Sequence, residues 1–195
     1  MKQINTMSKN KIRLGPYLYP MPVVLIGANV NEKPNFMPLA WISIVEFKPP
    51  MISISSNQGH YTNLGIKENK TFSVNSISAD LIIPMDYCGL NSGKNLDKSN
   101  IFEIFYGELM TAPMIKTSPL TLECKVIKTI DTEMGHDIFI GEIVGAYCED
   151  KYLTNGIPDI KKMNIIFFSM NDNQYWKIGE NVGRAWNIGK SYKKE

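Results

Sequence analysis

The chain has 195 residues, of which 44% are hydrophobic, and its formal net charge is only +2. We therefore expect one globular domain over residues 1–195, with residues 1–15 as a loosely ordered polar arm, and no nucleic-acid partner. The three cysteines include no CxxC pair, which argues against a disulfide framework or a zinc site. No apolar run is long enough to span a membrane and the N-terminus shows no signal peptide, so the expected location is cytoplasmic, with no membrane partner.

Short apolar runs separated by turn residues predict three strands in the first third of the chain. The strands are expected at residues 23–28, 36–45 and 51–56. Because they follow one another with short turns between them, they suggest an antiparallel meander. Pro38 must lie at an edge or a bulge of the sheet, since proline cannot donate to a strand ladder.

A two-turn helix is predicted over residues 62–69, with Thr62 as its N-cap and Lys67 near the C-terminal end, where positive charge is favoured. A strand over residues 71–75 should follow it. Two later segments favour helical or irregular structure. They are residues 81–88, interrupted by a proline, and residues 97–106, with apolar side chains on one face.

The second half of the chain is dominated by strand patterns. Residues 120–129 and 138–147 are the longest candidates, and residues 131–135 between them predict a hairpin loop. Shorter strands are expected at residues 165–170 and 175–178. Six or more strands with few helices predict a mainly β fold, a β-barrel with helical insertions.

The clearest indication of function lies at the end of the third strand. Ser55, Ser56 and Asn57 lead through a glycine-containing turn to the helix that begins near Thr62. Hydroxyls, an amide and the free N–H groups of a helix start would gather there, which suits a phosphate. The same residue types also form ordinary turns, and Thr62 fits both interpretations.

Five further residues have a structural and a functional interpretation each. Trp41 could pack in the core or flank a flat ligand, and Asn35 and Asn75 could be edge residues or bind the edge of a heteroaromatic ring. His136 could be a solvated loop residue, or it could face a redox ring and stabilise a reduced, anionic flavin. Lys98 could sit in solvent at a helix start, or it could contact a phosphate or a ring.

Several common catalytic motifs are missing from the sequence. It contains no GxGxxG, HExxH or GxSxG, which argues against a Rossmann dinucleotide site, a zinc protease and a serine hydrolase. Residues 89–95 look like a P-loop, but the glycines are one residue too close, and Asn95 stands where Ser or Thr would bind magnesium. We therefore expect no metal site.

An ordered set of motifs resembles a known family. The motifs are YPMPVVLIGA (19–28), KPNFMPLAWISIVEFKPPMISIS (33–55), HYTNLGIKENKTFSVN (60–75), DYCGLNSGKNLDKS (86–99), FYGELMTAPMI (105–115), LECKV (122–126), HDIFIGEI (136–143) and YWKIGENVGRAWNIGK (175–190). They follow one another in order along nearly the whole chain. With them the sequence resembles the flavin reductase-like FMN-binding split-barrel family, and most closely its flavoredoxin branch.

The resemblance implies a six-stranded Greek-key split β-barrel, a homodimer, and noncovalent FMN near the dimer interface. By position in the motifs, one set of residues would contact FMN and a second set would lie on the same rim. The first set is Asn35, Trp41, Thr62, Lys98, His136 and Phe168, and the second is Ser55, Ser56, Asn57 and Asn75. Thr62 and residues 55–57 would hold the phosphate, Trp41 and Phe168 would flank the ring, and His136 would be the catalytic residue.

The implied activity is redox chemistry on the flavin. Electrons or hydride would pass from NAD(P)H or a protein donor through FMN to free flavin, a ferric chelate or a redox-protein partner. A non-catalytic flavin carrier or sensor is the alternative, because a fold alone does not determine function. Cys88 is expected to be a buried, inert thiol rather than a redox-active one.

Overall fold

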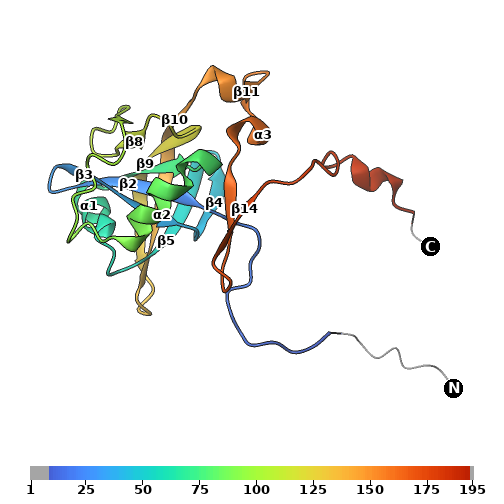
Figure 1. Cartoon of the computed structure of the whole chain (residues 1–195), viewed down its shortest axis with the longest axis horizontal. Coiled ribbons are helices and arrows are strands. Elements are labelled where there is room, and N and C mark those ends of the chain that lie inside the picture. The colour runs from blue at the N-terminus through green and yellow to red at the C-terminus, as the bar shows by residue number, and fades with distance from the viewer. Residues whose placement is uncertain (1–8, 194–195) are drawn as a thin grey trace.

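The computed structural model describes residues 9–193 and is built around one seven-stranded antiparallel sheet (Figure 1). In spatial order the strands are β3 (Lys33–Leu39), β2 (Val24–Val30), β6 (Thr71–Ser76), β9 (Leu120–Asp131), β10 (His136–Cys148), β5 (Pro50–Asn57) and β4 (Ile42–Phe47). A second sheet contains β1 (Met21–Pro22), β13 (Ile166–Ser169) and β14 (Gln174–Lys177). Two small ribbons pair β7 (Ile104–Phe105) with β8 (Met114–Ile115) and β11 (Leu153–Thr154) with β12 (Ile157–Pro158). The helices are α1 (Thr62–Asn69), α2 (Ile82–Leu90) and α3 (Ile160–Met163), with 3-10 turns at Ala79–Leu81, Asp150–Tyr152 and Ile188–Ser191.

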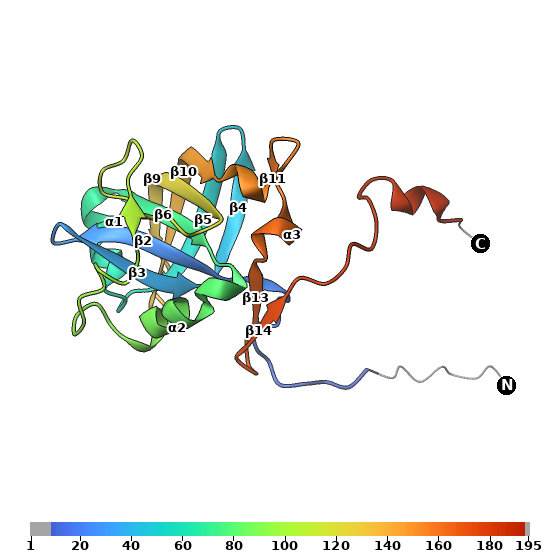
Figure 2. The same cartoon turned by 45° about the horizontal axis from the view of Figure 1, so that its top comes forward.

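Residues 33–47 close the sheet into a barrel (Figure 2). Their first half, β3, pairs with β2 at one edge, and their second half, β4, pairs with β5 at the other. Between the halves, the backbone N–H of Ser55 donates to the carbonyl of Trp41 at 2.9 Å. When β3 and β4 are counted as one bent strand, the sheet has the six strands expected for a split barrel.

One detail of the predicted first strands is wrong. The strand expected over residues 36–45 breaks at residues 40–41, because the chain leaves one sheet edge there and joins the other. The expected antiparallel pairing of successive strands is confirmed, because β3 pairs with β2 and β4 pairs with β5. The edge position of Pro38 is confirmed, because β3 pairs only with β2 in the sheet.

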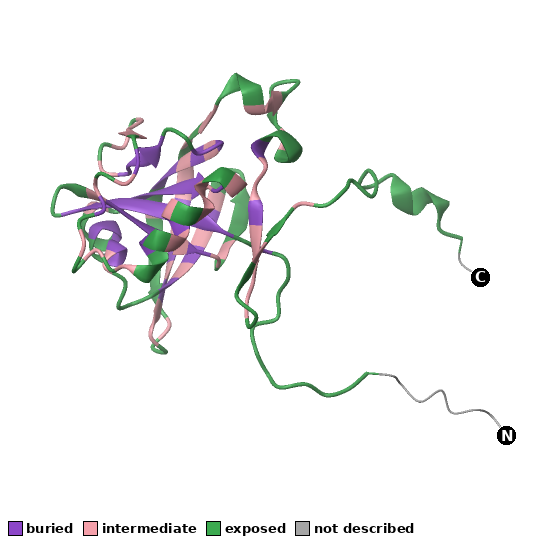
Figure 3. Cartoon of the chain, in the orientation of Figure 1, coloured by how far each residue is buried: buried purple, intermediate pink, exposed green. Residues whose placement is uncertain are grey.

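Both ends of the described chain leave the barrel on the same side (Figure 3). Residues 9–20 and 179–193 are exposed along their whole length. The arm expected over residues 1–15 falls partly outside the described residues, which begin at residue 9. No helix within residues 9–193 has the length and apolar character needed to cross a bilayer.

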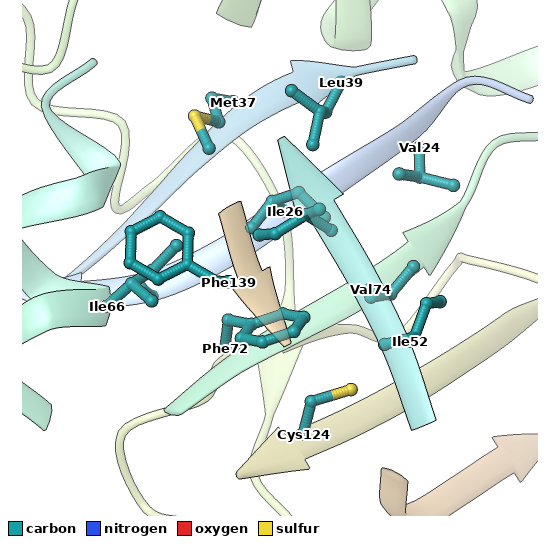
Figure 4. Packing of buried hydrophobic residues seen from close by; sticks show 12 residues of the cluster. Val24, Ile26, Met37, Leu39, Ile52, Ile66, Phe72, Val74, Cys124 and Phe139 are labelled. Atoms are coloured by element: carbon teal, nitrogen blue, oxygen red, sulfur yellow. The ribbon is translucent and has the colours of Figure 1, made fainter. Parts of the chain in front are cut away.

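The barrel interior is filled by side chains from alternate strand positions, as Figure 4 shows. Ile52 and Ile54 on β5 point inward, together with Phe72 from β6 and Phe139 from β10. Gly141 on β10 makes room for the Phe72 ring, because a Cβ there would lie 2.7 Å from that ring. A second apolar cluster lies under α2 and fixes this helix against β3. The two clusters hold the rim between α1 and α2 in place.

The helices differ from expectation in three ways. The helix at residues 62–69 is confirmed, but Thr62 is its first helical residue, and Tyr61 occupies the N-cap position. Pro84 does not break α2, because it lies in the first turn, where a backbone N–H needs no intrahelical partner. Residues 97–106 form turns and the short strand β7 instead of a helix, because Lys98 and Phe102 are held by contacts to other segments. The long hairpin of β9 and β10 and the late strands β13 and β14 are confirmed.

Candidate flavin site at the barrel rim

Lys98 is a buried cation on the wall of a cavity. Its side chain is only 3% exposed, and its Nζ donates hydrogen bonds to the carbonyls of Phe36 (3.0 Å) and Cys88 (2.7 Å). An ammonium group has three N–H donors, so one remains for a ligand. Within residues 9–193, the ion pairs found do not include Lys98. Burial lowers the pKa of Lys98, and a bound anion would offset the cost of burying this charge.

The cavity beside Lys98 has a volume of about 360 Å³, and we call it the polar cavity. Its lining comes from β3, the loop before α1 with the first residue of that helix, and the end of α2 with the segment that follows it: Asn35, Met37, Pro38, residues 59–62, residues 88–93 and Lys98. A neighbouring cavity of about 340 Å³ shares Asn35, Tyr61, Gly93 and Lys98 with it. A Cβ on Gly93 would lie 2.3 Å from Asn35 Oδ1, so a larger residue would intrude on this shared wall. These dimensions and donors suit a phosphate-bearing ligand.

Asn35 and Thr62 connect β3 to the first turn of α1. The Asn35 amide Nδ2 donates to Thr62 Oγ1 at 2.7 Å, and both residues are buried in the wall of the polar cavity. Since the Thr62 hydroxyl accepts this bond, its own hydrogen stays available for a ligand oxygen. The structure therefore brings Asn35, Thr62 and Lys98 together, although they come from three separate segments.

A chain of hydrogen bonds runs beneath the loop before α1. Ser56 Oγ donates to Asn63 Oδ1 at 2.8 Å, and Asn63 Nδ2 donates to the carbonyl of Asn57 at 2.9 Å. The ring nitrogen Nδ1 of His60 lies 3.0 Å from Ser56 Oγ. Ser56 thus points into the protein, while the backbone of Asn57 and the ring of His60 form the rim.

His60 was missed by the sequence reasoning, although it stands two residues before Thr62 in the motif assigned to phosphate binding. It lines the polar cavity. Burial lowers the pKa of His60, and the nearby charges of His136 and Lys98 lower this pKa further. The signal in the sequence was its position in the turn between strand and helix.

An apolar groove of about 450 Å³ lies on the outer face of the barrel. Its lining comes from residues 16–22, which include β1, from residues 40–43, and from β5 and β10: Pro16, Leu18, residues 20–22, residues 40–43, Ser53, Ser55 and Ile138. Trp41 is 37% exposed there, and its ring stacks on His136 with centroids 5.1 Å apart and planes 25° apart. Trp41 is thus not a core residue, and His136 belongs to a strand, where it pairs with Asn57, rather than to a loop.

The remaining candidates lie elsewhere. Asn75 is fully buried in the sheet, and its amide is used internally, donating to the Leu25 carbonyl and accepting from the Ile115 N–H. Phe168 on β13 packs against Tyr175 and lines another cavity, of about 520 Å³. Cys88 is buried, and burial raises its pKa, which fits an inert thiol.

Comparisons with known proteins identify the family and the fold of the chain. Residues 17–159 match the family model described as flavin reductase like domain. The flavoredoxin from Methanosarcina acetivorans is 50% identical, with a TM-score of 0.91 over 94% of this chain and 98% of that chain. The flavoredoxin of Desulfovibrio vulgaris (Miyazaki F) is 31% identical, with a TM-score of 0.86 over 93% of this chain and 99% of that chain. An uncharacterized protein from Archaeoglobus fulgidus is 30% identical over 86% of this chain and 94% of its own length. These findings confirm the predicted family resemblance and the mainly β split-barrel fold.

Proposed function

The chain belongs to the flavin reductase-like domain family, and from that membership we propose that it binds FMN noncovalently and acts as an oxidoreductase. Electrons or hydride would pass from NAD(P)H or a protein donor to free flavin, a ferric chelate or a redox protein. The similarity to two flavoredoxins supports this class of activity. The observation that carries the proposal is the buried Lys98 ammonium, which offers a free N–H to an anion in the polar cavity.

The phosphate end of FMN would occupy the polar cavity. Lys98 would supply a charge-assisted hydrogen bond, and the Thr62 hydroxyl, oriented by Asn35, would supply a neutral one. Bound FMN would contribute the redox chemistry, while the chain binds and orients it. We assign Ser56 and Asn75 no direct contact, because the side chains of both are used inside the protein.

The flat ring would lie on the apolar side of the rim. Trp41 and Ser55 line the groove there, and His136 stacks on the Trp41 ring at its edge. When protonated, His136 would place a positive charge beside the ring, which favours negative charge on it. His136 thus remains our candidate catalytic residue, with Asn57 as the rim residue paired to it.

A second copy of the chain would cover the apolar groove. Leu18, which lines it, is an exposed apolar residue, and so are Ile44 and Phe47 on β4, the strand that follows Trp41; Trp186 of the C-terminal segment is 96% exposed. Such surfaces mark protein–protein contacts, which supports a homodimer with FMN near its interface. Light scattering coupled to gel filtration measures the mass directly, and a monomer at micromolar concentration would contradict this part of the proposal.

The decisive experiment begins with the colour and flavin content of the purified chain. We expect yellow protein with one FMN per chain, and colourless protein that refuses added FMN would overturn the proposal. Stopped-flow reduction with NADH, NADPH and reduced ferredoxin then identifies the donor, and steady-state assays with free FMN or a ferric chelate identify the acceptor. Retained flavin without turnover from any of these donors would favour the carrier alternative.

Thr62→Ala tests the contact to the phosphate end of FMN, with the same measurement of flavin content. We expect weaker FMN binding, because the variant lacks the hydroxyl that Asn35 holds toward the cavity. Thr121→Ala is the matched control, since Thr121 is equally buried at 1% exposure but lines a different cavity. Unchanged FMN retention in Thr62→Ala would remove Thr62 from the site.

A further inference from the structure

We propose that His60 is a specificity-determining residue that distinguishes phosphorylated from unphosphorylated flavin. His60 lines the polar cavity, and its Nε2, the ring nitrogen that does not contact Ser56, would accept a hydrogen bond when neutral and take up a proton when a phosphate binds beside it. The inference rests on the proposed binding of FMN, and it adds a role for a residue outside the expected FMN-contacting set.

The hydrogen-bond network around Ser56 determines the tautomer of His60. Asn63 Nδ2 donates to the carbonyl of Asn57 at 2.9 Å, so its Oδ1 is the atom that faces Ser56. The single hydroxyl hydrogen of Ser56 goes to this Oδ1 at 2.8 Å, since the Met37 sulfur at 3.8 Å is a much weaker acceptor. Ser56 Oγ therefore has only lone pairs left for His60. At 3.0 Å, His60 Nδ1 must be the donor of the remaining bond.

The other ring nitrogen of His60, Nε2, is free of this network. Because Nδ1 carries the hydrogen in the neutral ring, Nε2 has a free lone pair. Ser56 is fully buried and contacts Nδ1, while His60 as a whole is an exposed residue that lines the polar cavity with Thr62 and Lys98. Protonation changes only Nε2, from an acceptor to a donor with a positive charge, and leaves the bond to Ser56 intact.

The charges around His60 determine how readily its ring takes up a proton. Lys98, from the segment after α2, and His136, from β10, both disfavour a proton on His60, and so does burial. The other titratable groups in the cavity wall are Tyr61 and Cys88. A phosphate monoester carries close to two negative charges above its second pKa near 6. Its arrival next to Lys98 reverses the local potential, so binding raises the affinity of Nε2 for a proton.

Calorimetric titration measures the linked proton. FMN and riboflavin are titrated at pH 7 into the full chain in buffers of different ionisation enthalpy, which yields the number of protons taken up per ligand. We expect uptake approaching one proton with FMN, none with riboflavin, and loss of the FMN uptake in His60→Gln. The difference between the native chain and His60→Gln cancels any proton exchanged by the phosphate itself. Loss of the uptake in His136→Gln but not in His60→Gln would overturn the assignment.

Nitrogen-15 NMR of the two imidazole rings tests the same inference without flavin. The neutral His60 ring should show the Nδ1–H tautomer, and Ser56→Ala should weaken that preference. Inorganic phosphate should raise the pKa of His60 in the native chain. An Nε2–H tautomer, or a pKa of His60 that phosphate leaves unchanged, would refute the inference even if FMN binds. If FMN does not bind but phosphate raises this pKa, the anion contact stands and the proposed flavin function fails.

Discussion

Replacing Lys98 by Met is the sharpest test of the polar cavity. Met keeps the length and apolar volume of the side chain and removes the ammonium. The phosphate would lose one hydrogen bond to a charged donor, which is worth about 1.5–3 kcal/mol. At about 1.4 kcal/mol for each factor of ten, FMN affinity should fall roughly 10- to 150-fold.

Riboflavin provides the internal comparison, because it carries the same ring without the phosphate. Its affinity should change little in Lys98→Met. Both ligands can be followed by quenching of flavin fluorescence, and thermal melts check that the variant folds despite losing the donor to the Phe36 and Cys88 carbonyls.

Lys33→Met is the matched control, since Lys33 lines the adjacent cavity but is exposed and paired with Asp97 at 2.9 Å. Lys33 is screened by water and already paired, so FMN affinity should change little in this variant. An equal loss for FMN and riboflavin in Lys98→Met, or the same loss in Lys33→Met, would refute the assignment of Lys98 to the phosphate.

Three further outcomes follow from other parts of the structure. Trp41→Ala should weaken the binding of FMN and of riboflavin alike, by about 1.5 kcal/mol or roughly tenfold. The control variant Trp176→Ala, on β14, should leave both affinities unchanged. If the two variants bound each flavin equally well, the proposed position of the ring would be contradicted. Glu123→Gln should lower the free energy of unfolding by about 2 kcal/mol and the melting temperature by roughly 4–8 °C. The reason is that the buried carboxylate accepts hydrogen bonds from two backbone N–H groups and from the Tyr147 hydroxyl. An unchanged melting temperature would refute this. The hydrogen bond from Tyr147 to Glu123 raises the pKa of Tyr147 to about 12, above its ordinary value. The stability that this bond adds is therefore complete below about pH 10 and disappears as pH rises toward 12. Chemical denaturation of the native chain and Tyr147→Phe should therefore converge over that interval, and a constant difference would argue against the shift.

The strands and α1 could be predicted because their signals are local. Residues 120–129 and 138–147 carry mostly alternating polar and apolar residues around a hairpin loop, and the helix at residues 62–69 has its boundaries where expected. Residues 97–106 have helical periodicity, yet the ammonium of Lys98 bonds two carbonyls from other segments. Such long-range contacts override local preference, and no periodic pattern reports them.

The candidate site was predictable in its residue types more than in its geometry. Asn35, Thr62 and Lys98 converge on one cavity, although only the resemblance to a family linked them beforehand. Asn75 has the same chemistry as Asn35, but its position in the middle of the sheet commits its amide to the backbone. The position of each strand in the closed barrel determines which of these two amides can line a cavity. His60 escaped notice because its role depends on partners that the sequence does not place beside it.

The bent segment at residues 33–47 has a mechanical consequence. It supplies Asn35 to the polar cavity and Trp41 to the apolar groove, and it is also the seam that joins the two edges of the sheet. A ligand that binds in both the polar cavity and the apolar groove would contact both halves of this segment and stabilise the junction between the two sheet edges. Saturating ligand should then slow amide hydrogen exchange in β3 and β4 together, so that two edges at opposite ends of the strand order open as one unit.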